Sequence, residues 1–373
     1  MKLAIIKETA PAETRVAATP DTVKKLVALG HKLCVEIGAG TVAGYTDEAF
    51  TEAGACLAKT AKATVQDADV LFKVRAPSDA EIKTLPEGLT VIALMDPFGL
   101  DPAPLNAAKI TALSMEFTPR ISRAQSMDAL SSQSNLAGYR AVIEGATIYG
   151  RAMPMMMTAA GTIAPAKVFV MGAGVAGLQA IATARRLGAV VSATDVRPAA
   201  KEQVASLGAK FIAVEDDEFK AAETAGGYAK QMSPEYQAKQ AELVAAHIAK
   251  QDIVITTALI PGRAAPVLVT ADMVAAMRPG SVIVDMAVSQ GGNCPLSAPD
   301  VVVDSGGVKV AGFSNLAMHL PADSSALYAR NLLAFLPLIT AEDGSLNLDT
   351  DDEIVTAMIL TRDGKTVNER LSS

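Results

Sequence analysis

Several features that mark common protein classes are missing from this sequence or scarce in it. Lys and Arg number 33 against 40 Asp and Glu, so the formal net charge is −7 and no basic excess is available for a nucleic-acid surface. No stretch supplies the ~20 consecutive apolar residues of a membrane-spanning helix. Residues 168–184 come nearest, but glycines and Gln179 interrupt them, and the N-terminus is unlike a signal peptide. We therefore expect a soluble chain with no nucleic-acid partner, which reaches a membrane only through other proteins.

Cysteine and aromatic residues are also scarce. The three cysteines, Cys34, Cys56 and Cys294, show no C-x-x-C spacing. They predict buried or incidental thiols in a reducing compartment rather than a disulfide framework or a zinc site, and we expect no metal. Only 4% of the residues are aromatic, whereas 50% are hydrophobic, with alanine and valine prominent. That composition is typical of helices packed closely on parallel strands.

Apolar runs alternate with helical patterns along most of the chain. This alternation predicts an α/β fold with two Rossmann-like, doubly wound parallel-sheet domains and a cleft between them. A long helical pattern beginning at Ser134 is interpreted as a link between the domains, and another at 326–339 as a return to the first. The predicted domains are residues 1–135 with about 318–373, and residues 136–317. Strands are expected at 3–6, 32–36, 69–74, 90–95, 110–115, 167–171, 189–194, 210–214, 253–257, 281–285 and 308–311, and a hairpin turn at 362–365.

The most informative motif is the glycine pattern of residues 172–177, which lies between a predicted strand and a predicted helix. Gly172 permits a tight turn, Gly174 lets backbone N–H groups approach a pyrophosphate, and Gly177 lets the helix pack closely on the strand. Asp195 ends the next strand, roughly 20 residues further on, where a carboxylate accepts both ribose hydroxyls and repels a 2′-phosphate. The pattern predicts an NAD(H) site rather than an NADP(H) site. The alternative is an ordinary glycine-rich turn.

A polar segment precedes the long helical pattern. Residues 116–133 are predicted to form a loop rich in serine, glutamine and charged residues. Gln125, Asp128 and Ser131 are spaced by three, so they would share a face on a helical turn. Such a face suits a carboxamide, because Asp128 accepts from its NH₂ group while Arg120 and Ser131 donate to oxygens. The alternative is a solvated, capped loop between domains.

A second polar stretch, residues 215–234, contains two adjacent glycines followed by Tyr228. Adjacent glycines favour a hinge, and a tyrosine ring covers an apolar face while its hydroxyl reaches a polar atom. We expect a mobile loop that closes over the cofactor. The alternative is a surface excursion without a lid role.

Several segments carry a resemblance to a known family. They read RVA at 15–17, RISRAQSMD at 120–128, SSQSNLAGYRAV at 131–142, MMMTAAGT at 155–162, AGGYAK at 225–230, TTALIPG at 256–262 and RPGSVIVD at 278–285. With the glycine pattern, they resemble the proton-translocating NAD(P)+ transhydrogenases, specifically their NAD(H)-binding component, which is domain I or the alpha-1 subunit. SRAQSMD and GGYAK are specific to that family, and the others are shared with the related alanine dehydrogenases. Residues 314–320 match the family less well.

The resemblance implies roles for residues at matching positions. Arg120, Gln125, Asp128 and Ser131 would be catalytic residues around the nicotinamide end, and Gln125 would also face the second nucleotide. The remaining NAD(H)-binding residues would be Ile121 and Ser122 in the same segment, Gly172, Gly174, Val175, Ala176 and Gly177 at the pyrophosphate, Asp195, Val196 and Arg197 at the adenosine, Gly227 and Tyr228 in the mobile loop, and Thr257, Ala258 and Leu259 along the cofactor.

An alanine dehydrogenase is the first alternative function. Amino-acid oxidation requires groups that move protons at the substrate, and in that family a lysine, a histidine and an aspartate do so while an arginine holds the carboxylate. Arg15 and Lys73 lie in matching motifs, but residues 93–99 contain no histidine, and Ser289 replaces the aspartate before Gln-Gly-Gly. A non-catalytic NAD(H) sensor is the second alternative, although a sensor has no need of the polar cluster around Asp128.

The scarcity of histidine suits direct hydride transfer between two nicotinamides, which needs positioning and no acid or base. The three histidines, His31, His247 and His319, are interpreted as structural or surface residues. The resemblance implies Re/Si-specific transfer between NADH on this chain and NADP(H) on a beta subunit. It also implies a homodimer, and a membrane alpha-2 subunit that moves protons. The chain would then lie in the cytoplasm, peripheral on the cytoplasmic face of the inner membrane.

Overall fold

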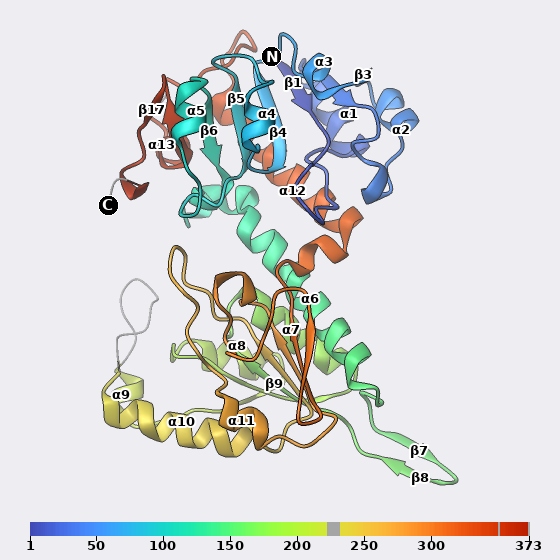
Figure 1. Cartoon of the computed structure of the whole chain (residues 1–373), viewed down its shortest axis with the longest axis vertical. Helices are drawn as coiled ribbons and strands as arrows, with labels where there is room; N and C mark the ends of the chain where they lie inside the picture. The colour runs from blue at the N-terminus through green and yellow to red at the C-terminus, as the bar shows by residue number, and fades with distance from the viewer. Residues whose placement is uncertain (222–231, 350, 372–373) are drawn as a thin grey trace. The chain divides into compact units, whose positions relative to one another are not determined.

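The chain divides into two compact units. The computed structural model describes residues 1–221, 232–349 and 351–371 (Figure 1). Unit 1 comprises Met1–Gln133 and Ala317–Ser373, and unit 2 comprises Ser134–Leu316.

Unit 1 is built on an eight-stranded sheet with the order β17-β16-β6-β5-β4-β1-β2-β3. The strands are β1 (Lys2–Ile5), β2 (Lys32–Glu36), β3 (Cys56–Ala58), β4 (Val70–Arg75), β5 (Thr90–Leu94), β6 (Thr111–Ser114), β16 (Ile359–Arg362) and β17 (Lys365–Thr366). The first six are parallel, in the 3-2-1-4-5-6 order of a doubly wound fold. The last two add an antiparallel hairpin whose turn follows Arg362, which confirms the predicted hairpin.

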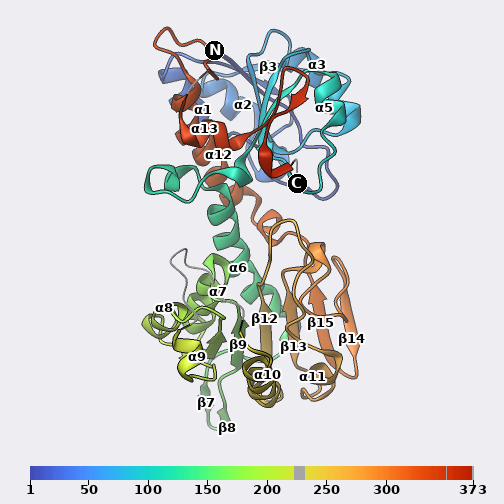
Figure 2. The same cartoon turned by 90° about the vertical axis from the view of Figure 1, so that its left-hand side faces the viewer.

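Helices cover both faces of the unit 1 sheet (Figures 1 and 2). Side chains of β1, β2 and β4 that point to one face form a core with α1, α2, α12 and α13, and the opposite face packs against α4 and α5. The helices are α1 (Pro20–Ala28), α2 (Asp47–Glu52), α3 (Ala61–Thr64), α4 (Asp79–Ile82), α5 (Ala103–Ala107), α12 (Pro321–Phe335) and α13 (Glu353–Met358). Both faces are therefore apolar, as the near-continuous apolar strands predict.

Unit 2 contains a seven-stranded sheet with the order β11-β10-β9-β12-β13-β15-β14. The strands are β9 (Lys167–Met171), β10 (Val190–Thr194), β11 (Lys210–Phe211), β12 (Ile253–Thr256), β13 (Val282–Asp285), β14 (Val302–Ser305) and β15 (Val308–Gly312). All neighbours are parallel except β14 and β15. The strand order reverses between β9 and β12, and the carboxyl ends at such a switch point are where doubly wound sheets bind ligands.

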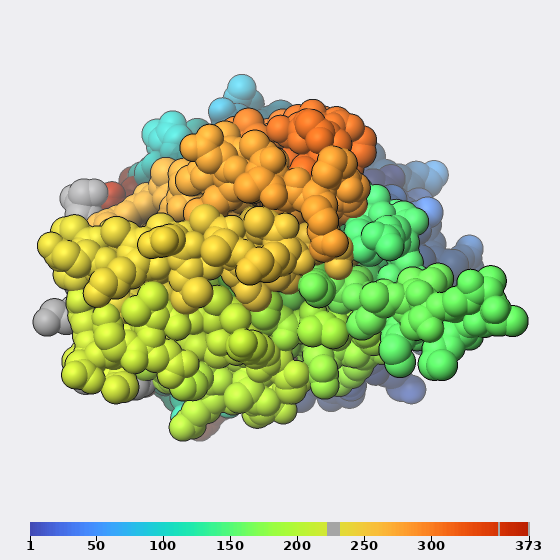
Figure 3. Space-filling model, turned by 90° about the horizontal axis from the view of Figure 1, so that it is seen from below, coloured from blue at the N-terminus to red at the C-terminus, as the bar shows by residue number. Residues whose placement is uncertain are grey.

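Two layers of helices cover the unit 2 sheet. One face packs against α6, α7 and α8, and the other against α10 and α11 (Figure 2). The helices are α6 (Ala129–Tyr149), α7 (Val175–Arg186), α8 (Ala200–Ser206), α9 (Asp217–Lys220), α10 (Pro234–Ile248) and α11 (Ala271–Ala275). A separate antiparallel hairpin, β7 (Met156–Thr158) and β8 (Gly161–Ile163), extends away from the body of the unit (Figures 1 and 3). The α/β class with two Rossmann-like sheets is confirmed.

Two expectations about individual elements are wrong. The long helix begins at Ala129 rather than Ser134, because the Asp128 carboxylate accepts the Ser131 N–H at 2.8 Å and caps a helix that starts inside the expected loop. The expected strand set also lacks β3, β7 and β8, which are three residues long each, and β14, an exposed edge strand. The signal for β14 was the Gly306-Gly307 pair, which is a favoured two-residue hairpin turn between the valine runs.

None of the helices in the described ranges is both long enough and apolar enough to span a lipid bilayer.

Candidate functional site

The glycine turn of unit 2 follows β9 and leads into α7. Gly172 has φ 102°, in the region that favours glycine, and its N–H bonds the Thr194 carbonyl at 2.9 Å. A Cβ on Gly177 would lie 1.8 Å from the Gly172 carbonyl oxygen. Both glycines are therefore required by the backbone: one makes the turn and the other allows α7 to lie directly against it.

The amino end of α7 is open. Gly174 is the N-cap, provides no side-chain cap for the N–H groups of the first turn, and would have no atom within 4 Å of an added Cβ. Val175, the first helical residue, is exposed, and Ala176 is partly buried. Uncapped N–H groups at the start of a helix bind anions through direct hydrogen bonds and the helix dipole. This end of α7 can therefore hold a phosphate group.

Asp195 lies just past the carboxyl end of β10, beside the turn. Its Oδ2 accepts from the Ala173 N–H at 2.7 Å and from Arg197 Nη2 at 2.9 Å, and its Oδ1 accepts from the Arg197 N–H and Nε, both at 2.9 Å. Burial opposes ionisation of this carboxyl, but the bonds from Arg197 and Ala173 outweigh it, so the pKa of Asp195 is lowered. The carboxylate is thus ionised and fixed, while neighbouring Val196 is exposed.

The segment after β12 closes the other side of the turn. Thr257 Oγ1 donates to the Gly172 carbonyl at 3.1 Å, and Leu259 is exposed. Asn293, which is fully buried, bonds both backbone groups of Ala258: its Oδ1 accepts from the N–H at 3.1 Å and its Nδ2 donates to the carbonyl at 2.9 Å. The structure therefore brings Thr257 against the glycine turn and shows that Asn293 holds the segment in place. Sequence patterns did not identify Asn293, whose only signal was its place after the Gln-Gly-Gly motif.

The polar segment of unit 1 is an ordered 3₁₀ helix, η3 (Ser122–Met127), followed by α6. Ala124 and Met127 are buried in the unit 1 core, with Ile121 packed against it, so the side chains between them face outward. The Ser126 carbonyl accepts from Asn331 Nδ2 of α12 at 2.8 Å. Arg120, Ser122 and Gln125 are exposed. The segment is thus a fixed turn that presents polar side chains.

Asp128 and Ser131 are directly bonded. Besides the capping contact, Ser131 Oγ donates to Asp128 Oδ2 at 2.5 Å. Gln125 contributes its backbone carbonyl, which accepts the Asp128 N–H at 3.3 Å, and its own side chain remains exposed. The nearby Arg123 is held by Asp352, the N-cap of α13, at 2.5 Å and is therefore less available to a ligand than Arg120.

The predicted mobile loop, with Gly227 and Tyr228, lies outside the described residues.

Two family models together match nearly the whole chain. "Alanine dehydrogenase/PNT, N-terminal domain" matches residues 4–137, and "Alanine dehydrogenase/PNT, C-terminal domain" matches residues 141–369. The chain belongs to the alanine dehydrogenase/PNT family. Within this family, the first part of the NAD(P) transhydrogenase subunit alpha of Rhodospirillum rubrum is 55% identical over 380 residues, which cover 100% of this chain and 99% of the relative.

Solved structures support the same branch of the family. A transhydrogenase from Sinorhizobium meliloti superposes with a TM-score of 0.90 at 54% identity, covering 98% of this chain and 100% of that one. An L-alanine dehydrogenase superposes with a TM-score of 0.84 at 25% identity, covering 100% and 98%. The predicted resemblance to the transhydrogenase alpha-1 subunits is therefore confirmed. The names of these transhydrogenase relatives describe a subunit of an oxidoreductase complex.

Within this family fold, Lys73 and Arg15 are buried and neutralised by carboxylates. Lys73 Nζ lies 2.8 Å from Glu81 Oε1 and 3.3 Å from Glu8 Oε2, and its side chain is 1% exposed. Arg15 is bonded to Glu13 at 2.7 Å and to Gln133 Oε1 at 2.8 Å. Burial raises the pKa of Glu8 despite the opposing effect of Lys73, which shows how far this cluster is from water.

The histidines of this family member lie in structural surroundings or at the surface. His31 is buried, His319 is exposed, and the His247 ring packs edge-on against Phe169 with its Nε2 2.8 Å from Ser192 Oγ. Among the residues that the structure describes, no group of three or more His, Cys, Asp or Glu side chains could hold a metal ion.

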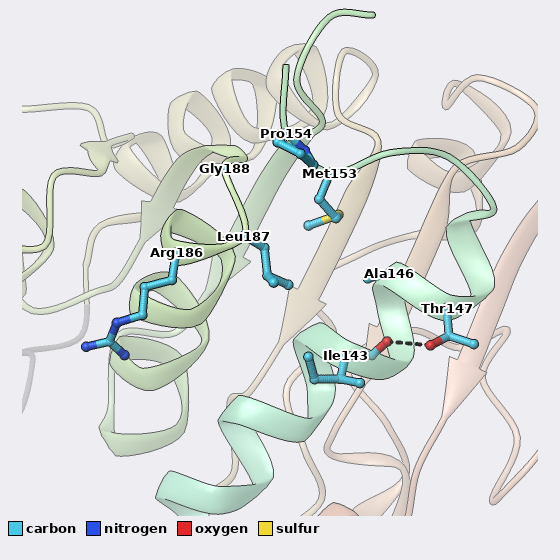
Figure 4. Close-up of a pocket in the computed structure, with 8 residues that line it drawn as sticks. All are labelled: Ile143, Ala146, Thr147, Met153, Pro154, Arg186, Leu187 and Gly188. Atoms are coloured by element: carbon cyan, nitrogen blue, oxygen red, sulfur yellow. Dashed lines mark hydrogen bonds between the residues drawn. The ribbon is translucent and has the colours of Figure 1, made fainter. Parts of the chain in front are cut away.

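A hollow of about 660 Å³ lies elsewhere in unit 2, at the carboxyl end of α7 (Figure 4). Apolar side chains of α6 and of the segment that precedes β7 line it, including Ile143, Ala146 and Met153, with Leu187 at the end of α7 (Figure 4). It contains none of the predicted site residues.

Proposed function

We propose that this chain is the NAD(H)-binding subunit of a proton-translocating NAD(P)+ transhydrogenase, acting in Re/Si-specific hydride transfer with NADP(H) on another component. The observation that carries the proposal is the combination of full-length similarity to transhydrogenase alpha subunits with a glycine turn beside an ionised, fixed Asp195.

NAD(H) is the expected ligand of the unit 2 site. Gly172, Gly174 and Gly177 with Val175 and Ala176 bind the pyrophosphate, since the open amino end of α7 offers backbone N–H groups. Asp195, Val196 and Arg197 hold the adenosine end, and Thr257, Ala258 and Leu259 lie along the nucleotide. The Asp195 carboxylate disfavours a 2′-phosphate, so NAD(H) is preferred over NADP(H).

The polar segment of unit 1 is assigned to the nicotinamide end. Asp128 accepts from the carboxamide NH₂ group, and Ser131, already bonded to Asp128, is oriented to donate to the carboxamide oxygen. Arg120 and Gln125 are exposed and available to the two nucleotides, with Ile121 and Ser122 beside them. These residues bind and orient the nicotinamide ring, and none of them moves a proton.

Hydride transfer between two nicotinamides needs no general acid or base. A hydride leaves C4 of NADH and joins C4 of NADP+, so the chain must hold one ring close to the other and exclude water. The surroundings of His31 and His247 support this chemistry, because neither belongs to the polar segment: His31 is buried, and the partly buried His247 packs against Phe169.

The proposal places NADP(H) on a beta subunit and proton movement on a membrane alpha-2 subunit. The relatives' names, which describe them as subunit alpha or as its first part, support a multi-subunit enzyme. The chain would then act at the cytoplasmic face of the inner membrane, held there by its partners.

We further assign a homodimer to this subunit. The β7–β8 hairpin presents Met155, Met156, Met157 and Ile163 to solvent, and Met157 is 77% exposed. Apolar side chains on an extended hairpin favour burial against another surface. Met153, close to the hairpin in sequence, lines the apolar hollow. In a symmetric dimer, the hairpin of each copy would therefore pack into the hollow of the other.

Reconstitution tests the central proposal. The purified chain is mixed with an NADP(H)-binding transhydrogenase component, and NADPH-dependent reduction of a spectroscopically distinct NAD+ analogue is followed with and without the chain. We expect exchange only when both components are present. Tight NADH binding without exchange contradicts the proposal and supports the NAD(H) sensor.

The alanine dehydrogenase alternative is tested by alanine with NAD+. Arg15 already pairs with Glu13, so it is not free to hold a substrate carboxylate, and Lys73 pairs with Glu8 and Glu81, so it is not free to move a proton at the substrate. We expect no NADH formation from alanine.

A further inference from the structure

Two of the three cysteines lie side by side on neighbouring strands of unit 1. Cys34 of β2 and Cys56 of β3 are direct partners in the parallel register. The row continues on the same face of the sheet through Ala4 of β1 to Leu71 of β4. Cys34 is 4% exposed, whereas Cys56, at the outer end of the row, is exposed to solvent.

The geometry of a parallel pair brings these thiols within reach of each other. Neighbouring strands lie about 4.7–4.9 Å apart, and a disulfide joins Cα atoms separated by about 4.4–6.8 Å. Burial raises the pKa of the Cys34 thiol to about 12, and a hydrogen bond with the Cys56 side chain contributes to the rise. The shared register therefore places the two thiols beside each other on neighbouring strands.

The edge position of β3 gives the pair freedom to close. A disulfide also needs Cβ atoms about 3.8 Å apart. The strand is three residues long and pairs only with β2, so it can move towards Cys34 without breaking a ladder on its other side.

We propose that Cys34 and Cys56 form an oxidisable dithiol, a modification site that takes low-molecular-weight disulfides as its oxidant. The exposed Cys56 thiolate attacks one sulfur of R–S–S–R, forming a Cys56–S–S–R bond and releasing R–S⁻. Cys34 then loses its proton and attacks Cys56 Sγ, releasing the second R–S⁻. The pair gives up two electrons, the oxidant becomes two R–SH that take up the two thiol protons, and a Cys34–Cys56 disulfide remains.

Cys294 provides an internal comparison. It is fully buried in unit 2, and its N–H donates to Asp285 Oδ2 at 3.0 Å. It lies in the segment between η4 (Val288–Gln290) and β14, and the sequence places no other cysteine in unit 2. Oxidation should therefore leave Cys294 as a free thiol.

Mass spectrometry tests the proposal on the full-length chain. The reduced protein is incubated with oxidised glutathione, quenched with acid and alkylated in denaturant. Trypsin releases both cysteines in one peptide, residues 33–59, because no Lys or Arg lies between Lys32 and Lys59. We expect this peptide to be unalkylated and two hydrogen atoms lighter, with alkylation of Cys56 at least tenfold lower than in the unoxidised sample.

Three variants complete the test. Cys294→Ser should form the linked peptide as the wild type does, and Cys56→Ser should form none. Cys34→Ala should stop at the first step, so that Cys56 carries glutathione. The proposal is overturned if wild-type Cys56 keeps glutathione while Cys34 is alkylated, or if both cysteines are alkylated after exposure to the oxidant. Peptide mass and cysteine alkylation do not depend on hydride transfer. A negative result for the dithiol would therefore leave the proposed enzyme function untouched.

Discussion

Replacing Lys73 with methionine separates a structural role for this lysine from a catalytic one. Methionine keeps most of the aliphatic volume and removes the ammonium group, which is bonded to Glu81 at 2.8 Å and to Glu8 at 3.3 Å. Tyr328 bonds only the backbone carbonyl of Lys73, so that contact survives. We expect loss of stability with hydride transfer preserved in each folded molecule.

The magnitude follows from burial. The Lys73 side chain is 1% exposed and that of Glu8 3%, so the variant leaves at least one carboxylate buried without its cation. Removing one partner of a buried ion pair costs about 3–5 kcal/mol, a large share of a typical folding free energy of about 5–15 kcal/mol. Urea unfolding of wild type and Lys73→Met measures the difference.

The deficit should depend on pH with a definite sign. Burial already raises the pKa of Glu8 above its ordinary value of 4.5, and loss of Lys73 raises it further. The folded variant then binds a proton that the unfolded chain has released, so the free energy of unfolding falls as pH rises through the raised pKa. We expect the cost of Lys73→Met to be smaller at pH 5 than at pH 8.

A second substitution provides the control. Adding Glu8→Gln to Lys73→Met removes the unpaired carboxylate, so most of the lost stability and most of the added pH dependence should return. If Lys73→Met instead lowers hydride exchange tenfold or more while stability and NADH affinity stay at wild-type values, Lys73 has a catalytic role and the reasoning fails.

Three further substitutions, one of them with a control variant, probe unit 2. Asp195→Ala should weaken NADH binding roughly ten- to hundredfold in a fluorescence titration, because bonds to a charged acceptor contribute about 1.5–3 kcal/mol. The control Asp304→Ala removes a carboxylate beside another turn, which is bonded to Lys309, and should leave NADH binding unchanged. Gly138→Ala places a Cβ 2.0 Å from the Ala176 carbonyl oxygen, so thermal unfolding should show a loss of at least about 1–3 kcal/mol; a wild-type melting temperature would refute that close approach. Asn293→Ala should cost about 1–3 kcal/mol in chemical unfolding and also weaken NADH binding, and unchanged affinity would mean that the Ala258 segment does not contact the nucleotide.

Local patterns predicted those parts of the molecule that depend on neighbours in sequence. The β9–turn–α7 unit was predictable because the apolar strand, the glycines and the helix follow one another within residues 167–186. The doubly wound sheets were predictable from alternation. The start of α6 was not, since polar composition at 116–133 was interpreted as a loop although Asp128 is also a favoured N-cap residue.

Contacts between distant segments were beyond the reach of sequence patterns. Lys73 and Glu8 are far apart in the chain, and only the parallel pairing of β1 with β4 brings their segments together. The same holds for Cys34 and Cys56, whose lack of a C-x-x-C spacing indicated unrelated thiols. Register between strands, rather than spacing along the chain, creates both clusters.

The contacts of Asp195 limit how a ribose can bind there. Its two oxygens already accept four N–H groups, three from Arg197 and one from Ala173, and a carboxylate offers about four acceptor sites. Ribose hydroxyls can therefore bond Asp195 fully only if the Arg197 side chain moves away. The displaced guanidinium would be a cation beside the ribose, where it would favour a 2′-phosphate. The proposed preference for NAD(H) would thus depend on where Arg197 goes when the nucleotide binds, as well as on the negative charge of Asp195.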